Sequence, residues 1–312
     1  MKFRRLGKSG LEVSVIGVGT YQFGGEWGKD FSQREADAIL DAAAECGINL
    51  IDTAECYGDH LAEQLIGDYL RHDRSRWIVA TKFGHRFHRF QERTRQWRPE
   101  EVRRQIEESL RALHTDYIDI LQYHSPSNEE LLTPGLKDLL ELEVRAGKVR
   151  HIGISLKAKL CRSSDTAQVQ RAPELDVQAM QILYNRLERG AEENIFPLCR
   201  ELDLGVIARV PLASGLLTGK YAFDSRFPDN DVRAHRQHSE VEEMLREVEE
   251  IRRNELPDGW FLSSWALAWC LKHPAVSCVI PGCKSVQQVL QNARTVDLLE
   301  ETHPQDIPYN CD

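Results

Sequence analysis

Four polar residues with complementary acid–base chemistry stand at the ends of apolar segments in this chain. Asp52 and Tyr57 close the segment that starts at residue 49, and Lys82 and His124 each end a later segment. A phenol has an ordinary pKa of about 10, and a neighbouring ammonium lowers it. We therefore predict that Tyr57 protonates a carbonyl oxygen and that Lys82 lowers the pKa of Tyr57. Asp52 would hold Lys82 in place, and His124 would orient the carbonyl.

Such side chains meet only if the segments before them are parallel strands, because the carboxyl ends of barrel strands share one rim. Eight short apolar, β-branched segments alternate with segments of helical period, over 13–20, 49–54, 77–82, 117–124, 149–155, 177–184, 205–211 and 276–281. This repeat favours an α/β fold, a closed (β/α)8 TIM barrel, over an open doubly wound sheet. A glycine-containing turn at 7–10 predicts an N-terminal β-hairpin in front of the barrel.

Helix signals support the same repeat. Ser32 and Glu35 form a capping box before a helical pattern over 33–46. Prolines 99 and 134 precede helical patterns over 100–113 and 135–146. An apolar stripe predicts a further helix over 239–253. Since the sequence contains no long linker, we expect residues 1–312 to form a single domain.

Composition argues against several other classes of protein. The 312 residues are 41% hydrophobic and 29% charged, as in globular enzymes. A formal net charge of −9 argues against nucleic acid or an anionic membrane as the main partner. No apolar stretch approaches the roughly 20 residues that span a bilayer, and no signal peptide is evident. Eight scattered cysteines without a Cys-x-x-Cys pair predict reduced, mostly buried thiols in a cytoplasmic protein.

The segment 83–98 is rich in basic and aromatic residues and places His85 and His88 in a His-x-x-His spacing. This spacing is compatible with a metal site, and the basic–aromatic mixture with nucleic acid. We predict neither, because no carboxylate or thiol completes a ligand set and the chain is acidic. A loop on the substrate side of the barrel is the simpler interpretation, and we expect no metal.

Taken together, these motifs resemble the aldo-keto reductase superfamily over nearly the whole chain. The resemblance rests on Ile-Asp-Thr-Ala-x-x-Tyr-Gly over 51–58, Ala-Thr-Lys over 80–82, and Asp-Tyr-Ile-Asp over 116–119 running on to His124. It continues through 17–20, 147–155, 181–185, 211–221, 280–282 and Asn292. It implies a TIM barrel that binds NADPH without a Rossmann domain, and Asp52, Tyr57, Lys82 and His124 as the catalytic tetrad. Consistently, Gly-Val-Gly over 17–19 lacks the third glycine of a dinucleotide fingerprint.

The resemblance also implies where NADPH/NADP+ would lie. Gly19 and Thr20 would line the nicotinamide and its ribose, and Ser155 and Gln181 would hold the carboxamide. Further cofactor contacts are expected from Arg209, Pro211, Leu212, Ser214, Leu216, Lys220, Arg233, Gly282, Lys284, Ser285, Gln288 and Asn292.

A helix N-terminus beside a lysine gives an independent argument for a phosphate at one end of the site. Lys284 precedes Ser285, which opens a helical segment, and free N–H groups beside a cation bind phosphate well. The alternative is that Ser285 merely caps the helix. The resemblance, which places the 2′-phosphate here, favours NADPH over NADH.

Two positions depart from the family pattern. Arg209 stands where many relatives have an aromatic residue, and Leu156 where many have Asn. We expect Arg209 either to pair with an acidic neighbour or to favour the neutral, reduced nicotinamide. Because the sequence ends soon after Asn292, we expect no long C-terminal loop over the substrate pocket. We expect Tyr21, Phe23, Trp27 and 83–98 to form its wall instead.

The predicted function is the NADPH-dependent reduction of aldehydes or ketones to alcohols, with a small-molecule carbonyl substrate. The alternative is an NADPH-binding regulatory protein, similar to a channel subunit, that turns over slowly. A Rossmann-type dehydrogenase is disfavoured by the missing glycine fingerprint and by the polar strand ends.

Overall fold

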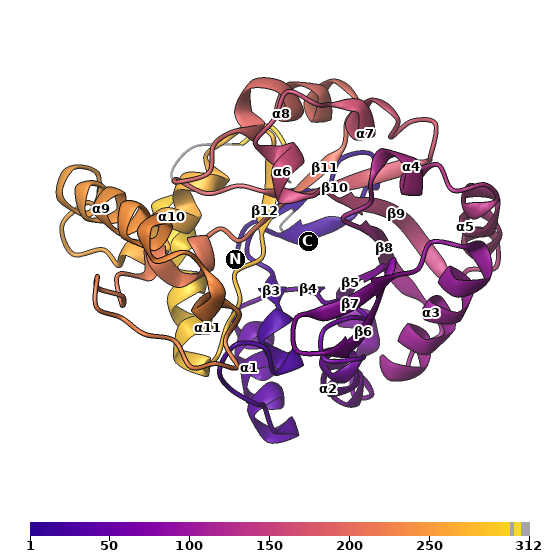
Figure 1. Ribbon diagram of the computed structural model, residues 1–312, viewed down its shortest axis with the longest axis horizontal. Helices are drawn as coiled ribbons and strands as arrows, with labels where there is room; N and C mark the ends of the chain where they lie inside the picture. Colours follow the sequence, from indigo (N-terminus) through magenta and orange to yellow (C-terminus); the bar gives the residue numbers. More distant parts are fainter. Residues whose placement is uncertain (300–302, 307–312) are drawn as a thin grey trace, which may run out of the picture.

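A closed barrel of parallel strands forms the centre of the computed structural model, which describes residues 1–299 and 303–306 (Figure 1). Parallel bridges from Ile16 to Val279 and from Gly19 to Gly282 join the first and last strands and close the sheet. The predicted (β/α)8 barrel is therefore confirmed. Its eight strands in spatial order are β3 (Val18–Gly19), β4 (Leu50–Asp52), β5 (Ile78–Phe83), β8 (Ile118–His124), β9 (Val149–Ser155), β10 (Val177–Leu183), β11 (Gly205–Arg209) and β12 (Val276–Val279).

The barrel interior consists of an apolar layer with a polar layer above it. Because side chains alternate along a strand, residues two apart share the inner face. The apolar layer includes Leu50, Ala80, Ile120, Ala179, Ile207 and Cys278. Two residues further along four of these strands stand Asp52, Lys82, Gln122 and Gln181. Because of this alternation, the barrel interior changes from an apolar layer to a layer of polar side chains at the carboxyl rim.

An N-terminal hairpin seals the opposite end of the barrel, as predicted. Strands β1 (Phe3–Arg5) and β2 (Glu12–Ser14) pair antiparallel. Leu6 and Val13 are fully buried and join the apolar layer of the barrel interior. The hairpin therefore excludes water from the bottom of the barrel and leaves the carboxyl rim as its open end.

Helices surround the barrel (Figure 1), and the predicted start signals are present. The Ser32 hydroxyl accepts from the Glu35 backbone N–H, and the Glu35 carboxylate accepts from the Ser32 N–H at 3.0 Å. The helices are α1 (Gln33–Glu45), α2 (Leu61–Leu70), α3 (Pro99–Ala112), α4 (Asn128–Leu131), α5 (Leu136–Arg145), α6 (Ala158–Cys161), α7 (Ala167–Gln170), α8 (Ala191–Glu201), α9 (His238–Asn254), α10 (Leu262–Leu271) and α11 (Val286–Ala293).

Two predicted elements differ from the structure. The strand predicted over 13–20 is split, because Val13 and Ser14 belong to β2 of the hairpin, where Ser14 also exchanges hydrogen bonds with Asn49. Val18–Gly19 forms the barrel strand, and Ile16 joins the barrel through its bridge to Val279. The loop predicted over 83–98 forms an antiparallel hairpin, β6 (His85–Arg89) and β7 (Glu92–Arg95). Its base is fixed by Trp97, whose ring lies 5.8 Å from that of Phe83.

Seven of the eight cysteines lie in the described residues, and all seven are free thiols, most of them buried. This confirms the prediction for these seven, while Cys311 lies outside the described residues. Within the same part of the chain, no helix is both long and apolar enough to cross a membrane.

Two neighbouring arginines of the hairpin allow a direct test of its role in stability. The Arg4 side chain is 2% exposed and donates to Leu271 O at 2.9 Å, Val276 O at 2.8 Å and Asp306 at 2.8 Å. We expect Arg4→Ala to lower the free energy of unfolding by about 3–5 kcal/mol, because it leaves buried acceptors unpaired. Urea denaturation of parent and variant measures this change.

Arg5→Ala is the matched control. The Arg5 guanidinium pairs with Asp203, but both side chains are nearly half exposed (47% and 49%). Exposed pairs contribute about 0–1 kcal/mol. Equal losses in the two variants would mean that Arg4 does not anchor the hairpin.

Candidate active site

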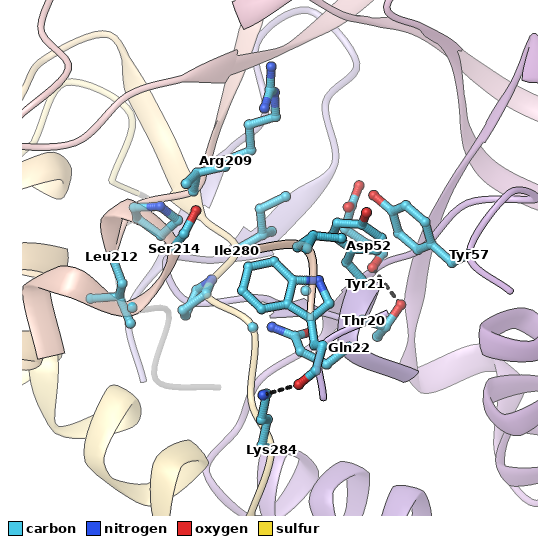
Figure 2. A pocket seen from close by; sticks show the side chains of 18 of the residues that line it. Thr20, Tyr21, Gln22, Asp52, Tyr57, Arg209, Leu212, Ser214, Ile280 and Lys284 are labelled. Carbon is cyan, nitrogen blue, oxygen red and sulfur yellow. Dashed lines mark hydrogen bonds between the residues drawn. The ribbon is translucent and has the colours of Figure 1, made fainter. Parts of the chain in front are cut away.

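A cavity of about 570 Å³ opens at the carboxyl rim of the barrel. It brings together most of the residues predicted to bind cofactor or substrate; Figure 2 shows several of them around one space. The predicted residues that line it are Gly19, Thr20, Asp52, Tyr57, His124, Ser155, Gln181, Arg209, Pro211, Leu212, Ser214, Lys220, Arg233, Gly282, Lys284, Gln288 and Asn292.

Three predicted residues lie outside the cavity wall. Lys82 is only 1% exposed and sits behind Asp52 and Tyr57. Leu216 packs into an apolar cluster with residues of α9 and α10. Ser285 is exposed at the start of α11, where its hydroxyl accepts from the Gln288 N–H.

A buried ion pair joins the ends of β4 and β5. Lys82 Nζ donates to Asp52 Oδ2 at 2.8 Å and to the Thr53 carbonyl at 2.6 Å. The other carboxylate oxygen, Asp52 Oδ1, accepts from Gln122 Nε2 at 3.2 Å and from Gln181 Nε2 at 2.5 Å. Both oxygens of the carboxylate are thus bonded, which lets it remain charged inside the barrel.

Tyr57 lies above this pair, in the turn between β4 and α2. Its hydroxyl is 3.4 Å from Lys82 Nζ, and its ring stacks on Tyr21 with centroids 4.7 Å apart. The turn fits tightly, since a Cβ at Gly24 would come within 2.7 Å of the Tyr57 carbonyl carbon. Glycine at position 24 is therefore required for the position of Tyr57.

The pKa of Tyr57 is raised well above its ordinary value, by desolvation first and by the Asp52 carboxylate second. The predicted lowering by Lys82 does not occur in this state of the protein. The reason is that desolvation of the buried phenol, together with the Asp52 carboxylate, outweighs the effect of nearby positive charges. The phenol therefore carries its proton throughout the neutral pH range and stands ready as an acid.

His124 ends β8 beside Tyr57, with ring centroids 6.1 Å apart. Burial, followed by the charges of Lys82 and Arg209, holds the pKa of His124 well below its ordinary value. The imidazole is consequently neutral and can donate one N–H. A protonated phenol and a neutral imidazole at one rim form a site suited to binding and protonating an oxygen.

The residues predicted to bind the nicotinamide are connected by hydrogen bonds to each other and to the ion pair of Asp52 and Lys82. The Ser155 hydroxyl donates to Gln181 Oε1 at 3.2 Å, and the Gln181 amide donates to Asp52. Thr20 Oγ1 donates to the Asp52 carbonyl at 2.9 Å, as drawn in Figure 2. The Gln22 side chain, missed by sequence reasoning, packs so closely on Gly282 that a Cβ there would overlap it.

Cations gather at the other end of the cavity, where α11 begins. Lys284 Nζ donates to the Trp27 carbonyl at 2.5 Å, far from Tyr57 in Figure 2. Arg233 donates to Asp231 at 2.8 and 2.6 Å, and Arg236 donates to Ser214 Oγ at 2.7 Å. An antiparallel bridge between Trp27 and Asp231 joins two loops at this end.

This end of the cavity fits a dinucleotide phosphate. Positive side chains surround a helix N-terminus. Two buried polar atoms in the wall, Gln22 Oε1 and Trp27 Nε1, have no hydrogen-bond partner within residues 1–299 and 303–306. Sequence reasoning missed several residues here: Arg236 and Tyr221 come from loops, Gln22 from a short helical turn, Ser263 from α10 and Gln291 from α11. No strand-end pattern marks such positions.

The two departures from the family pattern contact each other. Arg209 Nη2 donates to the Leu156 carbonyl at 2.9 Å. Among the described residues, no carboxylate pairs with Arg209. The expected acidic partner is therefore wrong, and the effect of Arg209 on the cofactor's redox state stays a prediction.

The substrate wall differs in part from the expected one. Tyr21 and Trp27 line the cavity as predicted, but Phe23 is fully buried and packs on Phe31 with ring centroids 4.9 Å apart. From the hairpin segment only His85 and Arg93 reach the cavity. A short helical turn after β3 directs Phe23 inward, which the sequence pattern does not reveal.

Comparison with known proteins gives a consistent result. A sequence model of the Aldo/keto reductase family matches residues 15–306. A probable voltage-gated potassium channel subunit beta of Oryza sativa is 30% identical over 325 residues, covering 98% of this chain and 94% of the relative. An NADH-specific methylglyoxal reductase of Escherichia coli is 30% identical over 318 residues, covering 96% and 94%. A solved structure, an aldo-keto reductase from Bacillus halodurans in its holo form, matches with a TM-score of 0.76 and 30% identity, covering 97% and 92%.

The buried ion pair predicts strong coupling between its two members. Lys82→Met should lower the free energy of unfolding by about 3–5 kcal/mol, because it leaves the Asp52 charge uncompensated. Lys82→Met/Asp52→Asn should lose at least about 1 kcal/mol less than the sum of the two single variants. Urea denaturation of all four proteins measures the coupling.

The control cycle uses Lys137 and Glu141, an exposed pair on α5 whose charged atoms lie 3.4 Å apart. Such helix pairs contribute about 0.2–0.5 kcal/mol, so Lys137→Met and Glu141→Gln should be nearly additive. If the Lys82 cycle is equally additive, the ion pair does not organise the site.

Proposed function

The chain belongs to the aldo/keto reductase family, and we propose that it is an NADPH-dependent reductase of aldehydes or ketones in which Tyr57 supplies the proton. Members of this family are oxidoreductases that act on carbonyl or CH–OH groups. The observation that carries the finer proposal is the protonated phenol of Tyr57 at the cavity mouth, 3.4 Å from Lys82 Nζ.

The bound reduced nicotinamide would supply a hydride to the carbonyl carbon. The chain's own part is to deliver a proton to the carbonyl oxygen from the Tyr57 hydroxyl. As that proton leaves, negative charge develops on the phenol oxygen beside Lys82 Nζ. A cation held in a water-poor site stabilises such charge strongly. Asp52 holds Lys82 in place beside Tyr57 through the 2.8 Å contact.

His124 would position the substrate in this scheme. Its neutral imidazole can donate an N–H to the same carbonyl oxygen that Tyr57 protonates. Two donors converging on one oxygen fix the face that the carbonyl presents. The surrounding wall mixes aromatic and cationic groups, from Tyr21, Trp27 and Arg93, which favours small polar carbonyl compounds.

The preference for NADPH rests on the cationic end of the cavity. Lys284 lies beside the N-terminus of α11, and Arg233 and Arg236 line the same end. An additional phosphate on the adenosine would gain favourable interactions there. The relative from Escherichia coli is named as NADH-specific, so the preference of this chain has to be measured directly.

A regulatory role is the second candidate. It is supported by the similarity to a probable potassium channel subunit of rice over 98% of this chain. The two functions differ in turnover: a dedicated reductase converts its substrate rapidly, whereas a regulatory subunit binds cofactor and turns over slowly.

Tyr57→Phe tests the proposed acid. We expect NADPH oxidation against a panel of aldehydes, ketones and sugars to fall by about 10²–10⁴-fold, the usual contribution of a general acid. NADPH affinity, followed by fluorescence, should change little because the phenyl ring remains. Tyr21→Phe is the matched control, since it removes a hydroxyl from the ring that stacks on Tyr57.

Three results would contradict the proposal in different ways. Turnover that survives in Tyr57→Phe would remove Tyr57 as the acid. An equal loss in Tyr21→Phe would point to a general effect of the stacked pair. Cofactor binding by the parent protein without turnover of any carbonyl compound would favour the regulatory role.

Lys284→Ala tests the cofactor preference. The Kd of NADPH should rise by about tenfold, the equivalent of about 1.4 kcal/mol, because a cation next to the expected 2′-phosphate is lost. The Kd of NADH should stay near the parent value. Lys29→Ala is the control, since Lys29 pairs with Glu35 at 2.9 Å. A parent protein that binds both cofactors equally would refute the preference.

A further inference from the structure

Four potential metal ligands converge beside the candidate active site. They are Glu55 and Cys56 in the turn after β4, His85 at the start of β6, and His124 at the end of β8. One ligand atom from each lies within 4.8 Å of all the others. No motif reveals this group, because its members come from three separate strand ends.

One oxygen of the Glu55 carboxylate lacks a partner in the described protein. Glu55 Oε1 accepts from the His85 backbone N–H at 3.0 Å, whereas Oε2 is buried without a hydrogen bond. The side chain is only 2% exposed, and Oε2 lies 3.7 Å from His124 Nδ1. Buried carboxylate oxygens are rarely left unpaired, so this atom points into the cluster toward a missing partner.

We propose that Glu55, Cys56, His85 and His124 bind a divalent transition metal, with zinc as the best match. One thiolate, two imidazoles and one carboxylate are all preferred zinc ligands. With Zn–S near 2.3 Å and Zn–N near 2.0–2.1 Å, tetrahedral geometry separates sulfur from nitrogen by about 3.5 Å. Cys56 Sγ lies 3.6 Å from His124 Nδ1, so this pair already has the required spacing.

The surroundings permit a cation to enter. Cys56, His85 and His124 line the cavity, which gives an entry path from solvent. Three of the four cations that act on His124 are paired with carboxylates, Lys82 with Asp52, Arg93 with Glu26 and Arg95 with Glu130, whereas Arg209 donates to the Leu156 carbonyl. On binding, the Cys56 thiol releases its proton to solvent and Glu55 Oε2 gains its missing partner.

The site differs from the His-x-x-His spacing in the sequence. His88 instead forms a hydrogen bond with Thr94 Oγ1 at 2.9 Å on the exposed face of the hairpin. His85 and His88 are therefore a matched pair: same residue type, same strand, and only one of them in the cluster.

The metal site shares His124 with the proposed reductase site. Because Cys56, His85 and His124 line the cavity beside Tyr57, zinc held by them takes up space next to the expected carbonyl position and fixes the His124 ring, so we expect zinc to inhibit carbonyl reduction. This consequence rests on the proposed function, whereas metal binding itself does not.

Cobalt(II) is the direct probe, because a thiolate ligand gives a ligand-to-metal charge-transfer band and a tetrahedral site gives strong visible absorption. Titration of the full-length parent protein with Co²⁺ should show both signals at one equivalent, and Zn²⁺ should displace them. Cys56→Ser should lose the charge-transfer band. His85→Ala should weaken Co²⁺ and Zn²⁺ binding by more than about tenfold, or about 1.4 kcal/mol.

The controls are His88→Ala on the same hairpin and Cys46→Ser, a half-buried thiol on the outer surface. Both should bind Co²⁺ and Zn²⁺ as the parent does. A parent that shows no tetrahedral cobalt signal would overturn the proposal. A signal that survives in Cys56→Ser and His85→Ala would equally overturn it. Circular dichroism of each variant distinguishes lost ligands from lost folding.

Activity provides a separate readout. Zinc should inhibit NADPH-dependent turnover in the parent, EDTA should restore it, and His85→Ala should resist the inhibition. Cobalt binding without any carbonyl turnover would leave the metal site intact while the proposed function fails. Turnover that zinc at saturating concentration leaves unchanged would disprove the inhibitory role.

Discussion

The buried contact between Lys82 and Asp52 is the constraint on which the rest of the site depends. Two opposite charges inside a barrel are stable only if each is fully bonded. Here the Asp52 carboxylate accepts from Lys82, Gln122 and Gln181, which come from three other strands. Their strands must therefore keep their register, and this requirement couples the barrel geometry to the chemistry at its rim.

The same contact sets the protonation states around it. Desolvation first and the Asp52 carboxylate second raise the pKa of Tyr57 against the opposing charge of Arg209, so the phenol keeps its proton. His124 is buried close to the same ammonium and stays neutral. The site thus holds two uncharged hydrogen-bond donors, Tyr57 and His124, next to the ion pair of Asp52 and Lys82. This arrangement suits an uncharged carbonyl group better than an anion at the reacting position.

The carboxyl rim also carries polar groups that make no contact required for closing the barrel. Glu55 and Cys56 share the turn that carries Tyr57, and the β6–β7 hairpin brings His85 to them. Trp27 and Asp231 join two loops at the cationic end of the cavity. A strand end sets the position of only the first residues of the loop that follows it. Longer loops can therefore approach one another over the open end of the barrel and bring these groups together.

The sequence by itself determined the repeat and the position of Asp52, Lys82 and His124 at one rim of the barrel. Apolar segments with strand-like composition ended at Asp52, Lys82 and His124, and parallel strands must present such ends at one rim. Most of the cavity wall was expected from the resemblance to the aldo-keto reductase superfamily, whereas the hairpin and the helix starts followed from equally local signals. These predictions succeeded because strand period and capping depend on residues close together in the chain.

Only the tertiary structure decided the remaining features. It turned Phe23 into the core, gave Arg209 a carbonyl partner in Leu156, and left Tyr57 with a raised pKa where the sequence predicted a lowered one. It also placed His85 beside Glu55, a carboxylate 30 positions away in the chain. Such outcomes depend on which distant groups share a buried volume. Burial and through-space charge act over distances in the fold, and the order of residues along the chain does not encode them locally.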